Sequence, residues 1–305
     1  MKTLEVLIQE YQQSHGTLPG LQGGLREEAF LLHIRASATR EAQIRALKGA
    51  DLGRPEDLCR ADPFGPYEAA AALATAGEVE EAIWLCFMAA MVGHHEAGGW
   101  RRLKDIYQQF DGRTLWSWAN VSADPLGFRT WLLDNLERLL GADGVKRRRG
   151  NHRKFCSPDP RKRNNFADTV EAYVSLIAKW TSQRTWVNAI ARSSGGDPEL
   201  AFDLMYKTLD PVKNFGRLGC FDFLTRLGHL GLARVEPRSP FLVGATGPAQ
   251  GANRLFTGNS AQPTRREARQ LDYLAGRLAK HLGVTMSVIE DALCCWNKAP
   301  DIVVL

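Results

Sequence analysis

The sequence predicts an all-α protein, because apolar residues recur at helical spacing along most of the chain and no stretch alternates as a β-strand does. Helix-start signals support this class at Asp197-Pro198 and at 264–267. The 305 residues suffice to bury a substantial core. We expect an N-terminal helical part (1–145), a basic connecting segment (146–165) and a C-terminal helical part (166–305), with the two helical parts forming one compact unit.

The first helices follow from apolar faces separated by glycine and proline. Two helices are predicted within 4–11 and 25–34, on either side of a Gly/Pro-rich break. A turn at 61–67 precedes an alanine-rich helix at 68–76, which Gly77 ends. Residues 80–92 are apolar on every side, which predicts a helix at the centre of the fold.

His94 and His95 follow this central helix, where they either cap it as cations or belong to a site. The stretch 100–140 is rich in aromatic residues, which form core or, alternatively, surfaces on which bases stack. Further helices are predicted over 166–180 and 185–191.

A glycine-containing turn lies within residues 210–232, between two predicted helices. Gly216 and Gly219 would let backbone N–H groups approach a phosphate, with Lys213 and Arg217 beside them. This arrangement is typical of a helix-hairpin-helix DNA contact, although an ordinary turn between helices has the same pattern.

Three glycines recur within 241–256, but their spacing matches no nucleotide-binding motif. We expect a loop that approaches a ligand closely, with Arg254 directed towards it. Two helices then end the chain. The first has a capping box at 264–267 and closes at Gly283, and the second has a cap signature at 287–290.

The basic segment (residues 146–163) holds nine Lys and Arg side chains and one Asp in eighteen residues. Since the whole chain has a net charge of +5, the rest of it is slightly acidic. A polyphosphate partner would gain affinity from released counterions, although such a run is also typical of a solvated loop. Asn151, His152, Phe155 and two prolines interrupt the run and favour a shaped binding segment.

The composition excludes several classes of protein. A hydrophobic fraction of 44% is ordinary for a globular protein, and no apolar run reaches the roughly 18 residues that span a bilayer. The N-terminus mixes polar and apolar residues, unlike a signal peptide, so we expect a cytoplasmic protein. The six cysteines form no CxxC pair or zinc-spaced cluster, so we expect reduced thiols, no metal and no cofactor.

Five segments carry a resemblance to a known family: ADPFGPYEAA (61–70), GNHRKF (150–155), NFGRLGCFDFLTRLGHLGL (214–232), GPAQGANRLF (247–256) and EDALCCW (290–296). Together they resemble the α-glutamyl/putrescinyl thymine pyrophosphorylase family, bacteriophage amino acid:DNA transferases that hypermodify thymine. The resemblance runs from about residue 62 to residue 296.

The resemblance implies a helical fold similar to helix-hairpin-helix DNA glycosylases. It implies a substrate of double-stranded DNA in which a DNA base kinase has phosphorylated 5-hydroxymethyluracil. An amine, such as glycine, another amino acid or putrescine, then displaces the phosphate. If the chain is phage-encoded, this takes place in the host-cell cytoplasm. The sequence has no obvious acidic cluster for the second ammonium of putrescine, which favours an amino acid.

The implied reaction needs a flipped base, a stabilised leaving phosphate, a deprotonated amine and contacts with the duplex. Asp222 and Asp291 are the candidate general bases, and each could instead anchor the ammonium. The alternatives are that Asp222 caps a helix and that Asp291 is a surface carboxylate. The candidates for the leaving phosphate are Asn151, His152, Arg153, Lys154 and Arg254, with His152 also counted as catalytic. The candidates for DNA contact are Lys146, Arg147, Arg148, Arg149, Lys213, Gly216, Arg217 and Gly219, together with residues 161–163.

One departure separates the chain from DNA glycosylases. Those enzymes place an Asp shortly after the hairpin, where it supports cleavage of the glycosidic bond, whereas residues 244–254 here contain no carboxylate. Chemistry on a base substituent is therefore favoured over base excision. A helix-hairpin-helix glycosylase or lyase and a non-catalytic DNA-binding protein remain as alternatives.

Overall fold

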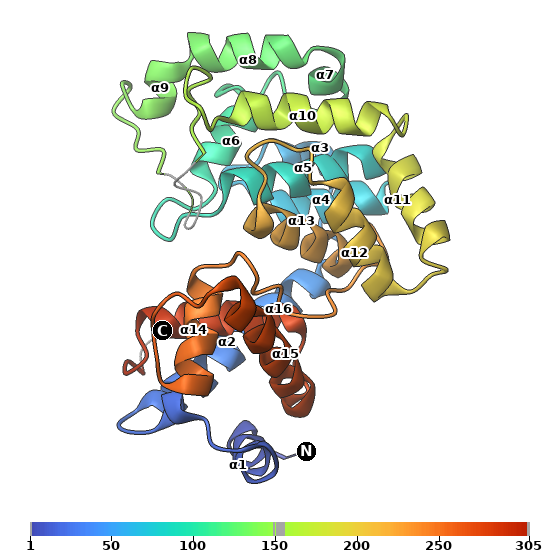
Figure 1. The fold of residues 1–305 in the computed structure, drawn as a ribbon. Helices are drawn as coiled ribbons and strands as arrows, with labels where there is room; N and C mark the ends of the chain where they lie inside the picture. Colours follow the sequence, from blue (N-terminus) through green and yellow to red (C-terminus); the bar gives the residue numbers. More distant parts are fainter. Residues whose placement is uncertain (1, 149, 151–155, 304–305) are drawn as a thin grey trace. The chain divides into compact units, whose positions relative to one another are not determined.

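The fold is built from α-helices, as the sequence predicts (Figure 1). The computed structural model describes residues 2–148, 150 and 156–303. Within these residues lie sixteen α-helices and one 3-10 helix, and β-type pairing is limited to isolated bridges between His95 and Gly99 and between Ser157 and Asn165. None of the described helices is both long and apolar enough to cross a membrane.

The chain divides into two compact units. Unit 1 combines Met1–Gln43 with Pro237–Leu305, and unit 2 is the continuous segment Ile44–Glu236. These limits differ from the predicted boundaries at 145 and 165. The difference arises because helical periodicity reports local structure and does not reveal which distant helices pack together.

Unit 1 is assembled from both ends of the chain. Its described elements are α1 (Leu4–His15), η1 (Pro19–Leu21), α2 (Arg26–Ala46, up to Gln43), α14 (Gly247–Thr257), α15 (Arg265–Leu282) and α16 (Met286–Lys298). Helix α14 packs against α16, α15 and η1, and α1 packs against α15.

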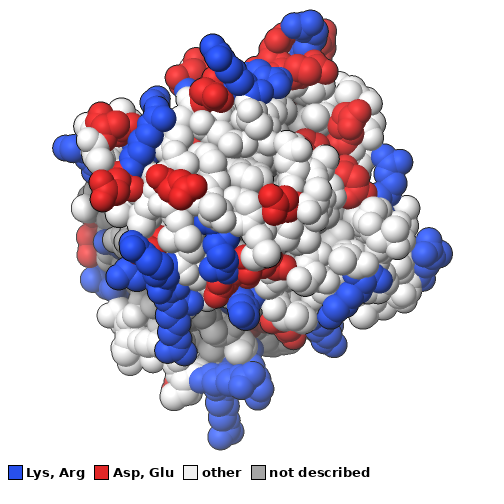
Figure 2. All heavy atoms as spheres, turned by 90° about the horizontal axis from the view of Figure 1, so that it is seen from above, with Lys and Arg blue, Asp and Glu red and all other residues white. Residues whose placement is uncertain are grey.

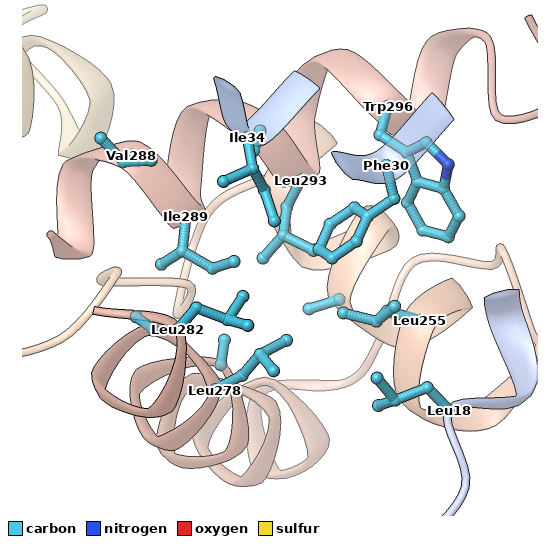
Figure 3. Packing of buried hydrophobic residues seen from close by; sticks show 14 of the residues in the cluster. Leu18, Phe30, Ile34, Leu255, Leu278, Leu282, Val288, Ile289, Leu293 and Trp296 are labelled. Atoms are coloured by element: carbon cyan, nitrogen blue, oxygen red, sulfur yellow. The ribbon is translucent and has the colours of Figure 1, made fainter. Parts of the chain in front are cut away.

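Large apolar side chains from both ends meet in the core of unit 1 (Figure 3). Phe30 of α2 lies beside Trp296 of α16, with the ring centroids 5.2 Å apart. The Trp296 Nε1 donates to the backbone oxygens of Arg26 and Pro300, at 3.2 Å each, so the buried indole is satisfied. Fully burying a large apolar side chain contributes about 1.5–3 kcal/mol to the stability of the fold. The contact between Phe30 and Trp296 therefore stabilises the packing of the early helix α2 against the last helix.

The glycine-rich stretch 241–256 is helical from Gly247 onward, so the prediction of a loop is wrong for residues 247–256. Gly251 faces α16 so closely that a Cβ atom would lie 2.2 Å from the carbonyl oxygen of Leu293. Pro248 lies in the first turn, where its fixed φ favours a helix start. The glycines thus serve close helix packing.

Unit 2 is organised around one buried helix. Its described helices are α3 (Pro55–Cys59), α4 (Pro66–Thr75), α5 (Val79–Val92), α6 (Arg101–Tyr107), α7 (Trp118–Ala123), α8 (Pro125–Asp134), α9 (Leu136–Leu140), α10 (Phe166–Ala178), α11 (Gln183–Ser193), α12 (Pro198–Thr208) and α13 (Arg217–His229). Every residue from Ala82 to Val92 in α5 is buried, and α4, α6, α7, α11 and α13 pack against it. The predicted central helix is therefore confirmed.

Aromatic rings fill the space around α5. Phe87 stacks on Tyr173 of α10 with centroids 3.8 Å apart, and the Trp84 Nε1 donates to the Trp116 backbone oxygen at 2.7 Å. Tyr107, Trp116 and Phe128 from the aromatic stretch 100–140 are buried as well. For these three residues, the core interpretation is confirmed.

The predicted starts of α12 and α15 are confirmed, and in both a polar capping side chain precedes the apolar pattern. Asp197 accepts hydrogen bonds from the first turn of α12, and Thr264 with Glu267 forms a complete capping box on α15. The cap predicted at Ser287 is wrong, because Thr285 accepts from the Val288 N–H and begins α16 two residues earlier. Both positions carry hydroxyl groups, so the pattern alone did not separate them.

Candidate functional site

A basic loop (residues 157–166) in unit 2 presents cations to solvent. Ser157 exchanges backbone hydrogen bonds of 2.9 Å with Asn164 and with Phe166, which closes the loop. Arg161, Lys162 and Arg163 lie at its tip and are exposed, whereas residues 158–160 are buried. The closed loop therefore holds three neighbouring cations outward, of which Arg161 also pairs with Asp159 at 2.8 Å while staying exposed.

The basic loop adjoins the turn between α12 and α13 (residues 209–216). Asn214 Nδ2 donates to the backbone oxygen of Asn165 at 3.3 Å, and Asn165 Oδ1 caps α10 by accepting from the Asp168 N–H at 2.8 Å. Hydrogen bonding from Arg129 lowers the pKa of Asp168, and the charge of Lys213 adds to that effect. Lys213 is exposed. The turn between two helices expected at 210–232 is present, and it contacts the basic loop at Asn165.

The two glycines of this turn differ in their surroundings. Gly216 caps α13, is exposed, and would have nothing within 4 Å of an added Cβ. Gly219 is buried, and a Cβ there would lie 2.9 Å from the ring of Phe215. Arg217 lies over the Phe221 ring at 4.6 Å. Gly216 thus leaves the helix N-terminus open, while Gly219 serves packing; the DNA contacts of both stay predictions.

Arg147 lies in the interior, with its side chain only 2% exposed. Its Nε donates to Asp105 Oδ2 at 2.5 Å, and its two Nη atoms donate to Asp143 at 2.7 Å each. The expectation that Arg147 contacts DNA does not fit this position, because the charge is already paired inside the protein. Lys146 and Arg148, on either side, are exposed and keep their predicted role.

Five predicted residues lie outside the described part of the chain: Arg149, Asn151, His152, Arg153 and Lys154. Gly150, which begins the GNHRKF motif, is described and buried. A Cβ at this position would lie 2.5 Å from the carbonyl oxygen of Val92 and 2.6 Å from the backbone of Gly93. Since only glycine allows this approach, the motif begins directly beside the end of α5.

Helix α13, which packs against α5, carries a polar face. Asp222, Thr225, Arg226 and His229 have the spacing i, i+3, i+4 and i+7, which places them on one side of the helix. Arg226 Nη1 and His229 Nδ1 are 3.2 Å apart. Asp222 lies in the second turn, and Gly216 is the cap residue, so the alternative that Asp222 caps this helix is wrong.

Aromatic side chains pack against this polar face. The Arg226 guanidinium lies 5.3 Å from the ring centroid of Tyr67, at the start of α4. Trp100 meets Tyr67 edge-on at 5.5 Å, and His94 meets Trp100 at 5.1 Å. Tyr67 and Trp100 are partly exposed and His94 is exposed. We call these three residues, with Asp222, Arg226 and His229, the Tyr67 cluster.

The Tyr67 cluster has the electrostatics of a hydrogen-bonding site. Burial raises the pKa of Tyr67 to about 12, against the opposing charge of Arg226, so its hydroxyl remains a neutral donor near pH 7. Burial and the neighbouring His95 lower the pKa of His94, which favours neutral imidazole over a cationic helix cap. His95 instead accepts from the Ala97 and Gly98 N–H groups and stabilises a turn.

The remaining two predicted site residues, Asp291 and Arg254, lie in unit 1. Asp291 Oδ2 accepts from Ser37 Oγ at 2.9 Å and from Arg40 Nη2 at 2.7 Å. Burial acts to raise the pKa of Asp291, but Arg40 and Ser37 together bring it below the ordinary value. Arg254 Nε donates to Asn297 Oδ1 at 3.3 Å. The predicted site residues are thus divided between the two units, with Asp222 in unit 2.

Sequence reasoning missed Tyr67 and Arg226. A signal for both was present, because Tyr67 lies in the ADPFGPYEAA motif and Arg226 lies four residues after the predicted Asp222. Helical spacing on α13 would have added Thr225, Arg226 and His229 to Asp222. The contact of α13 with Tyr67 is a tertiary fact that spacing does not reveal.

A family model described as alpha-glutamyl/putrescinyl thymine pyrophosphorylase clade 3 matches residues 26–305. The chain belongs to this family. The resemblance carried by the five motifs is thereby confirmed for nearly the whole chain of this pyrophosphorylase-family member. Comparisons with curated proteins and with solved structures return no match. Its six cysteines are free, and the described residues contain no group of three or more His, Cys, Asp and Glu side chains that could hold a metal ion.

Proposed function

We propose that this protein is a DNA-modifying transferase that replaces the phosphate of phosphorylated 5-hydroxymethyluracil in DNA with an amine, giving hypermodified thymine. The observation that carries this proposal is the family match over residues 26–305, whose description names thymine and pyrophosphorylase activity. The amine is glycine, another amino acid or putrescine. A DNA base kinase supplies the phosphorylated base, and no cofactor is invoked.

Contacts with the duplex are assigned to unit 2. The exposed cations Arg161, Lys162 and Arg163 belong to the basic loop, and Lys213 belongs to the turn before α13 that the loop contacts. Phosphates bind favourably where cations accompany a helix N-terminus. Lys146 and Arg148 extend this set. Figure 2 shows one face of the molecule, on which both basic and acidic side chains are present. We therefore assign DNA contact to these particular cations and not to a uniformly basic surface.

The flipped base is assigned to the Tyr67 cluster. Flipping costs roughly a few kcal/mol of unstacking, which stacking on a ring such as Trp100 offsets. Arg226 has the planar donor geometry that binds a phosphate in a bidentate manner. Ring electrons of the uracil expel the phosphate with the electron pair of the C–O bond, leaving an electrophilic exocyclic methylene. The amine then forms the new C–N bond and loses a proton.

Asp222 is the proposed acceptor of that proton, because it lies one helical turn from Arg226 on the same face of α13. The GNHRKF motif begins against the end of α5, directly before His94 of the Tyr67 cluster. This position supports Asn151, His152, Arg153 and Lys154 as further ligands of the leaving phosphate. Arg254 remains a proposed phosphate ligand in unit 1, oriented by Asn297.

The proposed reaction has a direct test. Protein incubated with phosphorylated 5-hydroxymethyluracil DNA and a panel of amines should yield a new thymidine derivative, detected by mass spectrometry after digestion to nucleosides. Free base or strand breaks would instead identify a helix-hairpin-helix glycosylase or lyase. Tight binding with no product from any amine would identify a non-catalytic DNA-binding protein.

The basic loop should control the salt dependence of DNA binding. Replacing Arg161, Lys162 and Arg163 together by Gln is expected to weaken duplex binding and to reduce the slope of log K against log salt by about 0.9 per lost phosphate contact. Fluorescence anisotropy at several salt concentrations measures this slope. As a matched control, Gln at Lys179, Arg184 and Arg192 removes the same charge from exposed positions elsewhere in the same unit. An equal loss of slope in both variants would contradict a specific role for the loop.

A further inference from the structure

Unit 1 contains a polar seam between α2 and α16 that the proposed reaction does not yet use. The seam consists of His33, Ser37 and Arg40 on α2 and of Asp291, Cys295 and Lys298 on α16. Each triplet has the spacing i, i+4 and i+7, so each helix presents one polar stripe. His33 and Ser37 are only 8% and 3% exposed. Polar groups are costly at such positions unless their hydrogen bonds are completed.

Two hydrogen-bonding positions in the seam are incomplete. Asp291 Oδ2 accepts hydrogen bonds from Ser37 and Arg40, whereas Oδ1 accepts, among the described residues, only from the weak Cys295 thiol donor at 3.6 Å. The buried His33 Nδ1 has no hydrogen-bond partner among the described residues. A carboxylate oxygen that can accept and an imidazole nitrogen that can donate are therefore left for a ligand.

The charges of the seam indicate which charged groups its ligand would need. The cations Arg40 and Lys298 both act on His33, together with the carboxylate of Asp291. Burial is the main cause that lowers the pKa of His33, so its imidazole is neutral near pH 7. Two cations and one carboxylate thus act on this imidazole. The next carboxylate along α2, Glu41, already accepts from the Thr285 and Ser287 hydroxyls.

The seam is open to solvent on one side. The side chain of Arg40 is 50% exposed and that of Asp291 is 44% exposed, whereas His33 and Ser37 form a buried floor. The charged groups at the rim are therefore accessible to a small molecule, and the unpaired His33 Nδ1 is buried below them. Both an ammonium and a carboxylate on that molecule would find a partner.

We propose that this seam binds a free amino acid as its zwitterion, with the ammonium on Asp291 Oδ1 and the carboxylate between Arg40, Lys298 and the Nδ1–H of His33. The proposal rests on the proposed function, in which it supplies the amine. A diamine fits poorly, because the cations Arg40 and Lys298 repel a second ammonium. The low pKa of Asp291 suits an anchor that stays ionised better than a proton acceptor.

The test measures binding without DNA. Isothermal titration calorimetry of the full chain with glycine should show saturable binding, while methylamine, acetate and putrescine should each bind at least about tenfold more weakly, since each lacks one charge-assisted contact. Asp291→Asn should raise the Kd for glycine by about tenfold or more. Asp301→Asn is the matched control, because Asp301 also pairs with an arginine of α2, Arg26, at 2.7 Å, outside the seam.

Each outcome bears on the inference separately from the proposed reaction. Putrescine or methylamine binding as tightly as glycine, or equal Kd values for the Asp291→Asn and Asp301→Asn variants, would overturn the seam as an amino-acid site. The ligand comparison needs only the unaltered protein, so a poorly folding variant does not remove the test. Glycine binding without any modified nucleoside would support the seam and contradict the transferase. If the Asp291→Asn variant still modifies DNA at the unaltered rate with subsaturating glycine, the transferase would be supported and the seam contradicted.

Discussion

Replacing Arg226 by Lys is expected to lower turnover of phosphorylated 5-hydroxymethyluracil DNA by about 100-fold, the effect of losing one preorganised donor at a developing anion. Lysine keeps the charge but cannot supply two parallel N–H donors from the position over Tyr67. Because the duplex contacts are assigned to the basic loop and its neighbouring cations, DNA affinity should change by less than about threefold. Single-turnover kinetics and anisotropy measure the two quantities on the same preparation.

Arg184→Lys provides the matched control for this prediction. Arg184 lies at the start of α11 in the same unit, is exposed, and donates to the backbone oxygen of Gly77 at 3.1 Å. Its replacement should leave both turnover and DNA affinity unchanged. If the two Lys variants turn over equally fast, the Tyr67 cluster does not hold the leaving phosphate.

Replacing Arg147 by Met is expected to lower the free energy of unfolding by about 3–5 kcal/mol, because it leaves Asp105 buried without the partner that its position requires. The Asp105 side chain is 4% exposed, and Arg101 alone would remain paired with it. Urea denaturation followed by circular dichroism measures the change. Combining Arg147→Met with Asp105→Asn should recover part of the loss, since the second change removes the stranded charge.

Arg163→Met serves as the comparison for Arg147→Met. Both positions belong to the same basic segment and lose the same charge, but Arg163 is exposed at the loop tip. Stability should therefore change little at Arg163, while DNA affinity should fall. A similar stability loss in both variants would show that burial is not what distinguishes Arg147.

The helical class and most long helices could be predicted because their periods are local. The central α5 was recognisable from its all-round apolar sequence, and α12 and α15 from their caps. Helix α14 was not recognisable, because its glycines indicate a loop unless the backbone of Leu293 is known to lie against Gly251. Short helices such as α3 and α9 carry too few turns to show a period.

The site residues were predictable only where residues that are adjacent in the sequence have the same role. Residues 161–163 and Lys213 were recognised as cations, but their proximity depends on the hydrogen bond from Asn214 to Asn165. Arg147 and Arg148 are indistinguishable in the sequence, yet one is buried against Asp105 and the other is exposed. Composition predicts how much charge a segment carries, and only packing decides which charges face water.

The order of segments in unit 1 has a consequence for biosynthesis. Helix α1 and most of α2 are translated before unit 2, but their partners α14, α15 and α16 are translated only after the whole of unit 2. At ordinary elongation rates, translating Pro237–Leu305 alone takes on the order of 10 s. During that time the apolar face around Phe30 lacks its native cover. Nascent chains stalled before residue 237 should therefore recruit chaperones through the N-terminal helices, while Ile44–Glu236 is already free to fold.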